Sequence, residues 1–284
     1  AGIRMSARST WRQAGLLVGP ALLLLVAVYL YPLGRLFVLS VGGGGPGGAG
    51  LEAYRRLAES SVYIDVLLRT TRISVVVTLV CLLAAYLVAY VMTRVGPAWF
   101  RVLMVFVLLP LWTSILVRTY AWMVLLQANG VLNNVLRWLR VIDEPLRLMY
   151  NETGVVIGMA QVLLPFAILP LYASLRSIDP RLSRAAQSMG AGPWRRFYSL
   201  TLPLSMPGMA TAALLVFVQG LGFFITPALL GGSRVITLAM VIETQVVDLL
   251  DWSLASAAAM VLLVLTAALV VGFDRLVGLD RVWA

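Results

Sequence analysis

The chain has 284 residues, of which 61% are apolar and 12% charged, against roughly 45–50% and about 25% in an average soluble protein. A soluble domain of this length could not bury so much apolar surface, so the composition indicates an integral membrane protein. All 22 basic residues are arginine and histidine is absent. This excludes a G-x-x-x-x-G-K-[ST] phosphate loop and every catalytic triad or metal site that needs histidine.

Uncharged runs of about 20 residues, the length that crosses a bilayer as a helix, predict an all-α protein with six membrane spans. The third span contains Arg118. We start the fifth at Pro207, because Pro203 and Pro207 should interrupt an earlier helix. The first span resembles a secretion signal, but its apolar stretch is long and no A-x-A-like site follows, so we expect it to stay as an anchor. The spans cover about 14–39, 73–93, 102–126, 153–175, 207–230 and 252–273.

The arginines are unequally divided between the two sides of the membrane. With the N-terminus inside, the inner segments carry 12 arginines against 3 aspartates, and the outer loops carry 8 arginines against 9 acidic residues. The positive-inside rule therefore predicts cytoplasmic tails at 1–13 and 274–284, on either side of a transmembrane domain at 14–273. The same rule accounts for the net charge of +10, so we expect no nucleic-acid partner.

The long inner loop, 176–206, carries the most specific pattern. Asp179-Pro180 is typical of a helix start, and Gly190 supplies a stop about ten residues later. In this short helix Leu182, Ala185, Ala186 and Met189 share one face, whereas Arg181, Arg184 and Ser188 share the opposite face. Its apolar face could dock in a groove of another protein, or pack on the chain's own spans, with the alanines against Trp194 or Phe197.

These residues resemble the "EAA" loop of ABC importer permeases, whose consensus is E-A-A-x3-G-x9-I-x-L-P. Ala185-Ala186, Gly190 and Leu202-Pro203 match, Leu200 replaces Ile, and Arg184 replaces the Glu. Further segments are similar to the first permease component of spermidine/putrescine transporters: LLPLWTSILVRTYAWMVLL (108–126), PFAILPLYASLRSIDP (165–180), LPLSMPGM (202–209), FFITPALLGG (223–232) and DWSLASA (251–257).

The resemblance implies a type I ABC importer permease fold in a bacterial plasma membrane. Such a subunit is not an enzyme and binds no cofactor; ATP and Mg are used by two copies of a cytoplasmic ATPase. A second six-span permease and an extracytoplasmic substrate-binding protein complete the assembly. The short helix would be the coupling helix, with contacts to the ATPase from Leu182, Arg184, Ala185, Ala186, Met189, Gly190, Leu202 and Pro203.

The expected cargo is a polyamine such as putrescine or spermidine. A polycation with an apolar stem favours aromatic faces and carboxylates, so the candidate pathway residues are Trp112, Tyr120, Trp122, Glu243, Asp248 and Asp251. Aromatic residues near a span's end are also typical of interfacial belts. Arg118 is expected to reach the outer headgroups or pair there, because a cation in the path would oppose a cationic substrate.

Other functions stay open at this point. Related permeases carry opines, phosphonates or ferric iron. A self-sufficient secondary transporter or channel is a further alternative, but such proteins usually carry acidic residues within their spans, and none lies in the six predicted here.

Overall fold

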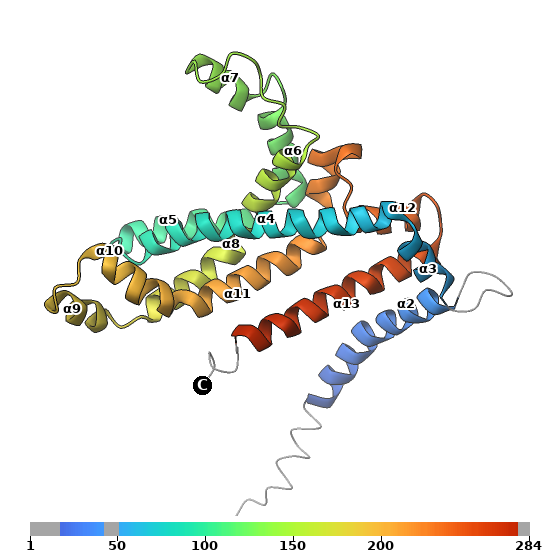
Figure 1. The fold of residues 1–284 in the computed structure, drawn as a ribbon, viewed down its shortest axis with the longest axis horizontal. Coiled ribbons are helices and arrows are strands. Elements are labelled where there is room, and N and C mark those ends of the chain that lie inside the picture. The colour runs from blue at the N-terminus through green and yellow to red at the C-terminus, as the bar shows by residue number, and fades with distance from the viewer. Residues whose placement is uncertain (1–17, 43–50, 278–284) are drawn as a thin grey trace, which may run out of the picture. The chain divides into compact units, whose positions relative to one another are not determined.

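The computed structural model describes residues 18–42 and 51–277. All the regular secondary structure in these residues is helical (Figure 1). They form two compact units. The first contains the described residues up to Ser60 with Ile242–Val261, and the second contains Ser61–Val241 with the described residues from Leu262. The principal helices are α2 (Tyr31–Val41), α3 (Glu52–Glu59), α4 (Ser61–Met92), α5 (Pro97–Trp112), α6 (Ile115–Leu126), α7 (Val131–Trp138), α8 (Glu152–Ser177), α9 (Pro180–Ser188), α10 (Pro193–Arg196), α11 (Leu202–Leu221), α12 (Leu238–Val247) and α13 (Trp252–Val277).

Six helical segments in the described part of the chain are long and apolar enough to cross a membrane. This number agrees with the prediction, although several boundaries differ. The segments are Val18–Val41, Ser61–Met92, Ile115–Trp138, Glu152–Ser177, Pro193–Leu221 and Trp252–Phe273.

The single helix predicted over 102–126 is two helices, α5 and α6, separated at Thr113 and Ser114. Pro110 lies inside α5 and has no N–H to continue the hydrogen-bond ladder. The hydroxyl of Thr113 donates to the carbonyl of Pro110 at 2.9 Å, and Thr113 itself is extended, with φ −89° and ψ 145°. A side chain that competes for the backbone in this way favours a helix end.

The fifth span begins earlier than predicted, because the chain stays helical from Pro193 through Pro203 and Pro207 to Leu221. A π-helical turn at Phe197–Thr201 precedes Pro203, and the N–H of Leu202 donates to the carbonyl of Phe197, five residues back. This wider turn changes the hydrogen-bond register just before the proline, which has no N–H to offer. The expectation that proline would break the helix was therefore wrong.

After α11 the chain bends instead of continuing to the predicted end at 230. Short helical turns, η3 (Pro227–Gly231) and η4 (Gly232–Arg234), meet α12 at an angle of 87°. The N–H of Leu238 at this bend donates a hydrogen bond of 2.9 Å to the buried hydroxyl of Thr70 in α4. A side chain of α4 thus satisfies the N–H of the first residue of α12, which that helix cannot pair itself.

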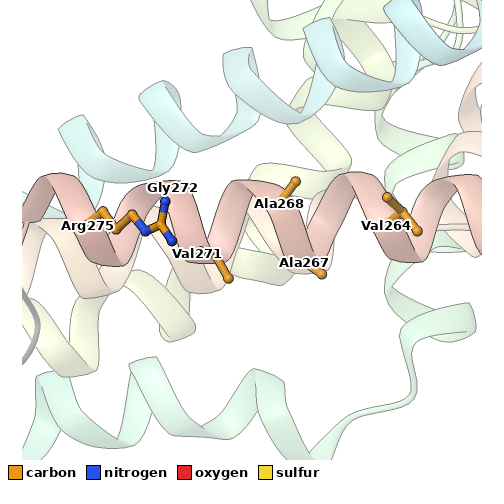
Figure 2. Close-up of a pocket in the computed structure, with 6 residues that line it drawn as sticks. All are labelled: Val264, Ala267, Ala268, Val271, Gly272 and Arg275. Atoms are coloured by element: carbon orange, nitrogen blue, oxygen red, sulfur yellow. The ribbon is translucent and has the colours of Figure 1, made fainter.

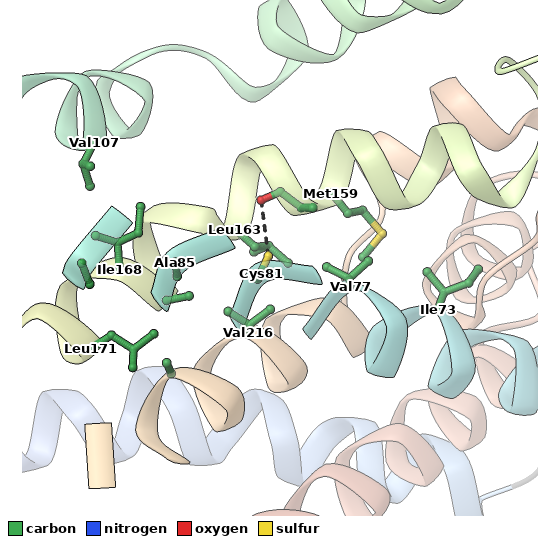
Figure 3. Close-up of a cluster of buried hydrophobic side chains, with 14 of the residues drawn as sticks. Ile73, Val77, Cys81, Ala85, Val107, Met159, Leu163, Ile168, Leu171 and Val216 are labelled. Atoms are coloured by element: carbon green, nitrogen blue, oxygen red, sulfur yellow. Dashed lines mark hydrogen bonds between the residues drawn. The ribbon is translucent and has the colours of Figure 1, made fainter. Parts of the chain in front are cut away.

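The core of the second unit forms where α4, α8 and α11 pack together (Figure 3). Small and medium side chains of α4 recur every fourth residue and are fully buried: Val77, Cys81, Ala85 and Ala89. The thiol of Cys81 donates to the carbonyl of Ala160 in α8 at 3.4 Å. Cys81 is therefore a packing residue.

Glycine allows two of these helices to approach closely. A Cβ placed on Gly208 of α11 would lie 2.3 Å from the Cβ of Ser174 and 2.9 Å from the carbonyl oxygen of Pro170, both in α8. A real Cβ atom essentially never makes non-bonded contacts this short, so a larger residue at this position must push the helices apart. Small residues at helix contacts are the usual means of association between spans, where lipid removes the hydrophobic driving force.

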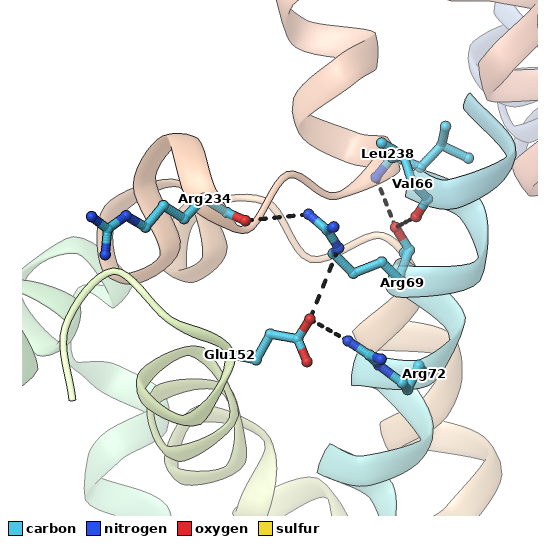
Figure 4. Close-up of polar contacts among 7 residues, drawn as sticks. Val66, Arg69, Arg72, Glu152, Arg234 and Leu238 are labelled. Carbon is cyan, nitrogen blue, oxygen red and sulfur yellow. Dashed lines mark hydrogen bonds and ion pairs between the residues drawn. The ribbon is translucent and has the colours of Figure 1, made fainter. Parts of the chain in front are cut away.

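A polar cluster joins the beginning of α4 to the beginning of α8 (Figure 4). Glu152 forms ion pairs with Arg72 and, at 3.9 Å, with Arg69. Arg69 also donates to the carbonyl of Arg234 at 3.2 Å. One carboxylate therefore holds two cations, and the three segments α4, α8 and η4 are connected at this end of the unit.

In the first unit, polar contacts join α2 and α3. The hydroxyl of Tyr54 donates to the hydroxyl of Ser40 at 2.9 Å. Arg56 lies 3.7 Å from Asp251, whose other carboxylate oxygen accepts a hydrogen bond from the N–H of Leu254 at 3.0 Å. Asp251 therefore caps the start of α13.

We expect Gly208→Ala to destabilise the permease by about 1–3 kcal/mol, the usual cost of overpacking a close contact. Thermal unfolding of the purified chain in lipid nanodiscs measures the loss. Adding Ser174→Gly should recover part of it, because the nearest atom to the new methyl group is then removed. Gly272→Ala is the matched control: nothing lies within 4 Å of an added Cβ there, and alanine favours helix. Equal losses for Gly208→Ala and Gly272→Ala would contradict the close-contact account.

Candidate functional site

The predicted short helix is present as α9, and its start is built as the sequence predicts. Pro180 occupies the first turn, and the carboxylate of Asp179 accepts a hydrogen bond from the N–H of Arg181 at 2.8 Å. A capping carboxylate satisfies an N–H that the helix itself cannot pair, and proline supplies a φ suited to the first turn.

The end of α9 depends on Gly190, which has φ +82°. Its N–H donates to the carbonyl of Gln187 at 2.9 Å, and the N–H of Ala191 donates to that of Ala186 at 3.0 Å. These two bonds form a Schellman motif, which needs a left-handed residue and favours glycine. Nothing lies within 4 Å of a Cβ added to Gly190, so the requirement for glycine within this chain is conformational and not steric.

Most of the surface of α9 is exposed, and none of its residues is buried. Of the predicted coupling residues, Leu182, Arg184, Ala185, Met189 and Gly190 are exposed, Ala186 and Leu202 are half-buried, and Pro203 is exposed in the first turn of α11.

The side of α9 that contacts its own chain is a polar one. Arg196 of α10 donates to the hydroxyl of Ser183 at 3.4 Å and to the side-chain oxygen of Gln187 at 3.2 Å. Ser183 and Gln187 are one helical turn apart and therefore share a face. The exposure of Ala185 disfavours the alternative in which this residue packs on Trp194 or Phe197.

An aromatic contact connects this loop to the membrane helices. The ring of Phe197 lies edge-on to the rings of Tyr86 and Tyr90 in α4, with centroid distances of 5.8 Å in both cases. The hydroxyl of Tyr86 lies 3.1 Å from that of Ser205 in α11. Sequence reasoning gave Phe197 no such role, because only the fold brings it to α4.

The predicted aromatic pathway residues differ in their surroundings. Trp112 is 89% exposed and Tyr120 is exposed at the surface of α6. Trp122 packs against the core and donates its indole N–H to the side-chain oxygen of Gln161 in α8 at 3.3 Å. Gln161 was missed, although it is the one amide side chain in the apolar run Thr153–Leu175.

The predicted acidic pathway residues belong to the first unit, whereas the aromatic ones belong to the second. Glu243 and Asp248 are exposed. The carboxylate of Asp251 caps α13 and pairs with Arg56, as described above. Within its own unit, Asp251 therefore has a structural role.

Arg118 lies in the first turn of α6, next to the buried Thr119, whose hydroxyl is 3.2 Å from that of Thr226. The Nε and Nη1 atoms of Arg118 are buried and have no hydrogen-bond partner in the described part of the chain. Of the two alternatives expected from the sequence, pairing is not formed with any described residue, and contact with the outer headgroups stays a prediction.

A surface pocket runs along the second half of α13 (Figure 2). Its lining residues are Val264, Ala267, Ala268, Val271, Gly272 and Arg275. The lining contains no carboxylate, and its charged group is a cation. It does not suit the cationic substrate expected from the sequence, and it involves none of the predicted pathway residues.

The sequence of this chain matches a known protein family. Residues 82–278 match the family model described as binding-protein-dependent transport system inner membrane component. Two similar proteins are both named spermidine/putrescine transport system permease protein PotB. That of Haemophilus influenzae is 36% identical over 225 residues, which are 79% of this chain and 78% of that protein. That of Escherichia coli K12 is 34% identical over 226 residues, 79% and 82% of the two chains.

The fold is that of solved ABC importer permeases. A chain in the crystal structure of a bacterial alginate ABC transporter, in complex with an alginate pentasaccharide-bound periplasmic protein, superposes with a TM-score of 0.77 at 19% identity, covering 94% of each chain. The capped exposed helix, the six spans and the two sequence comparisons agree. The chain therefore belongs to the binding-protein-dependent transport system inner membrane components, the multi-pass permease subunits of type I ABC importers, and is not itself an enzyme.

Proposed function

We propose that this chain forms half of the substrate pathway in an ATP-driven polyamine importer. It works with a second six-span permease, two copies of a cytoplasmic ATPase and an extracytoplasmic binding protein. ATP and Mg are used by the ATPase, in agreement with the absence of lysine, and hence of a phosphate loop, from this chain. The observation that carries the proposal is α9, an ordered helix with no buried residue, in a chain similar to PotB permeases over 79% of its length.

The orientation follows from the arginines. The segment that contains α9 is rich in arginine, so the positive-inside rule favours a cytoplasmic α9 and predicts both termini on the cytoplasmic side of a bacterial plasma membrane. The Arg69–Glu152–Arg72 cluster, at the other end of α4, then faces outward.

Coupling requires a mechanical path from α9 into the membrane. Arg196 binds α9, and the neighbouring Phe197 contacts α4 through Tyr86 and Tyr90. From α11, Gly208 contacts α8 at close range. Force applied to α9 by closing ATPase subunits would thus reach α4, α8 and α11 together, because packed helices transmit displacement as stiff bodies.

A polyamine is supported by the names of the relatives. A second cargo class is favoured by Arg118, because its Nε and Nη1 atoms are buried without a partner among the described residues, and such a guanidinium suits an anion. One relative, 27% identical over 87% of this chain, is named putative 2-aminoethylphosphonate transport system permease protein PhnU, of Salmonella typhimurium.

ATPase activity of the assembled complex in nanodiscs, with its own binding protein, tests the function and the cargo together. We expect stimulation by binding protein loaded with putrescine or spermidine, and none by empty binding protein. Stimulation by 2-aminoethylphosphonate alone would keep the importer and reject the polyamine. Opines and ferric iron form the remaining arms. Uptake that proceeds without the ATPase would contradict the importer altogether and favour a secondary transporter or channel.

Two substitutions of Gly190 distinguish the effect of backbone strain from the effect of a lost contact with a partner. Alanine and phenylalanine both pay the cost of a left-handed residue, about 1 kcal/mol, but only phenylalanine projects bulk into the open space beside the residue. We expect Gly190→Phe to abolish ATPase co-purification and transport, and Gly190→Ala to retain most of both. Membrane levels of the two variants serve as the control for insertion. Full transport by Gly190→Phe would remove this residue from the coupling surface.

Phe197 tests the mechanical path. Phe197→Ala removes three edge-to-face contacts, with Tyr86, Tyr90 and Tyr198, worth about 0.5–1.5 kcal/mol each, but leaves α9 and its caps intact. We expect the ATPase to bind normally while transport per ATP hydrolysed falls severalfold, measured in proteoliposomes. Phe106→Ala, the same substitution at an exposed phenylalanine of α5, is the matched control. If both variants lose transport equally, the Phe197 contact is not the transmitting one.

A further inference from the structure

We propose that the surface which receives α9 is acidic on one wall and apolar on the other, with carboxylates that pair with Arg181 and Arg184. This inference rests on the proposed function, because it assigns that surface to the partner ATPase. It specifies the charge and the polarity of a surface that this chain does not contain.

The first observation is the exposure of α9. A helix of nine residues is too short to be stable alone in water, and helices of this length are usually stabilised by packing an apolar face. Here the apolar residues face outward: Met189 is 82% exposed, Leu182 is 46% exposed, and the nearby Trp194 is 73% exposed. The described part of the chain supplies no packing for this face, which leaves it available to another molecule.

The second observation is the charge. The stretch 176–201 contains five arginines and a single acidic residue, Asp179. The carboxylate of Asp179 is engaged with the N–H of Arg181 at the start of the helix. Arg181 and Arg184 are exposed and form no ion pair with a described carboxylate. Their countercharge is therefore not found in the part of the chain that the structure describes.

The third observation is how these side chains are arranged around the helix. Arg196 binds Ser183 and Gln187 and so turns that side toward α10. At helical spacing, Arg184, Ser188 and Arg181 follow on one flank, and Ala185, Met189 and Leu182 follow next to them. The free surface thus has a basic half and an apolar half. Alanine in the apolar half lets a partner's backbone approach closely, as a helix-in-groove contact requires.

Anionic lipid is the other source of countercharge, and the geometry disfavours it. Helix α8 has 26 residues and is about 39 Å long, longer than the ~30 Å hydrocarbon core. Figure 1 shows α9 beyond the ends of α8 and α11, farther along the direction of these helices. An interfacial helix lies at headgroup level, whereas α9 projects past the ends of the spans.

The absence of lysine provides a direct test. Arg184→Lys or Arg181→Lys introduces the one lysine ε-amine in this chain, and a zero-length carbodiimide joins an amine only to a carboxylate in contact with it. In the assembled complex we expect an amide bond to an aspartate or glutamate of the ATPase, identified by mass spectrometry. Arg137→Lys, an exposed arginine of α7, is the matched control and should give no link to the ATPase.

Charge reversal gives an independent measurement with a definite sign. We expect ATPase binding to weaken about threefold for Arg181→Gln or Arg184→Gln, the scale of one exposed ion pair, and further for Arg181→Glu or Arg184→Glu. Tighter binding of the Glu variants, or no change, would overturn the acidic wall. Gly190→Phe would still abolish binding in that case, so this failure is distinct from failure of the coupling assignment. Binding that tracks the phosphatidylglycerol content of the nanodisc, with no link to the ATPase, would overturn the proposal in favour of lipid.

Discussion

The close approach of α4, α8 and α11 is the constraint on which the rest of the structure depends. In a bilayer, lipid tails are as apolar as leucine, so helices associate through tight packing rather than through escape from water. Gly208 against Ser174, and the buried row of Val77, Cys81, Ala85 and Ala89, supply that packing. Because these three helices form a stiff core, contacts at either end, Phe197 on one side and Glu152 on the other, act on the whole unit.

The two ends of this core differ in a way that suits a coupled transporter. At one end, Glu152 pairs with Arg72 and Arg69, so the cations have a partner within the chain. At the other, Arg181 and Arg184 have no carboxylate partner among the described residues, and apolar side chains lie open beside them. The first end is completed internally, whereas the second is the surface that we propose receives the ATPase.

Sequence reasoning predicted most of the fold and the local structure of α9. The Asp179 cap, the left-handed Gly190 and six apolar segments all follow from local rules of composition and helix ends. It did not predict the break between α5 and α6 or the helix that continues through Pro203. The break depends on the hydrogen bond from the Thr113 hydroxyl to Pro110, and the continuing helix depends on the π turn before Pro203. The general preference of proline for helix ends includes neither contact. Sequence reasoning also missed Gln161 and the role of Phe197, whose partners are far away in the chain.

The 87° bend between η4 and α12 has a consequence for where lipid can reach. Peptide groups outside a regular helix lose too much hydration to face hydrocarbon chains, so such a bend persists at membrane depth only where protein or water surrounds it. Here Thr70 accepts the hydrogen bond from Leu238, and Arg69 donates to the carbonyl of Arg234. Wherever this bend enters the hydrocarbon layer, its surroundings must therefore be protein or water, and acyl chains are excluded from it.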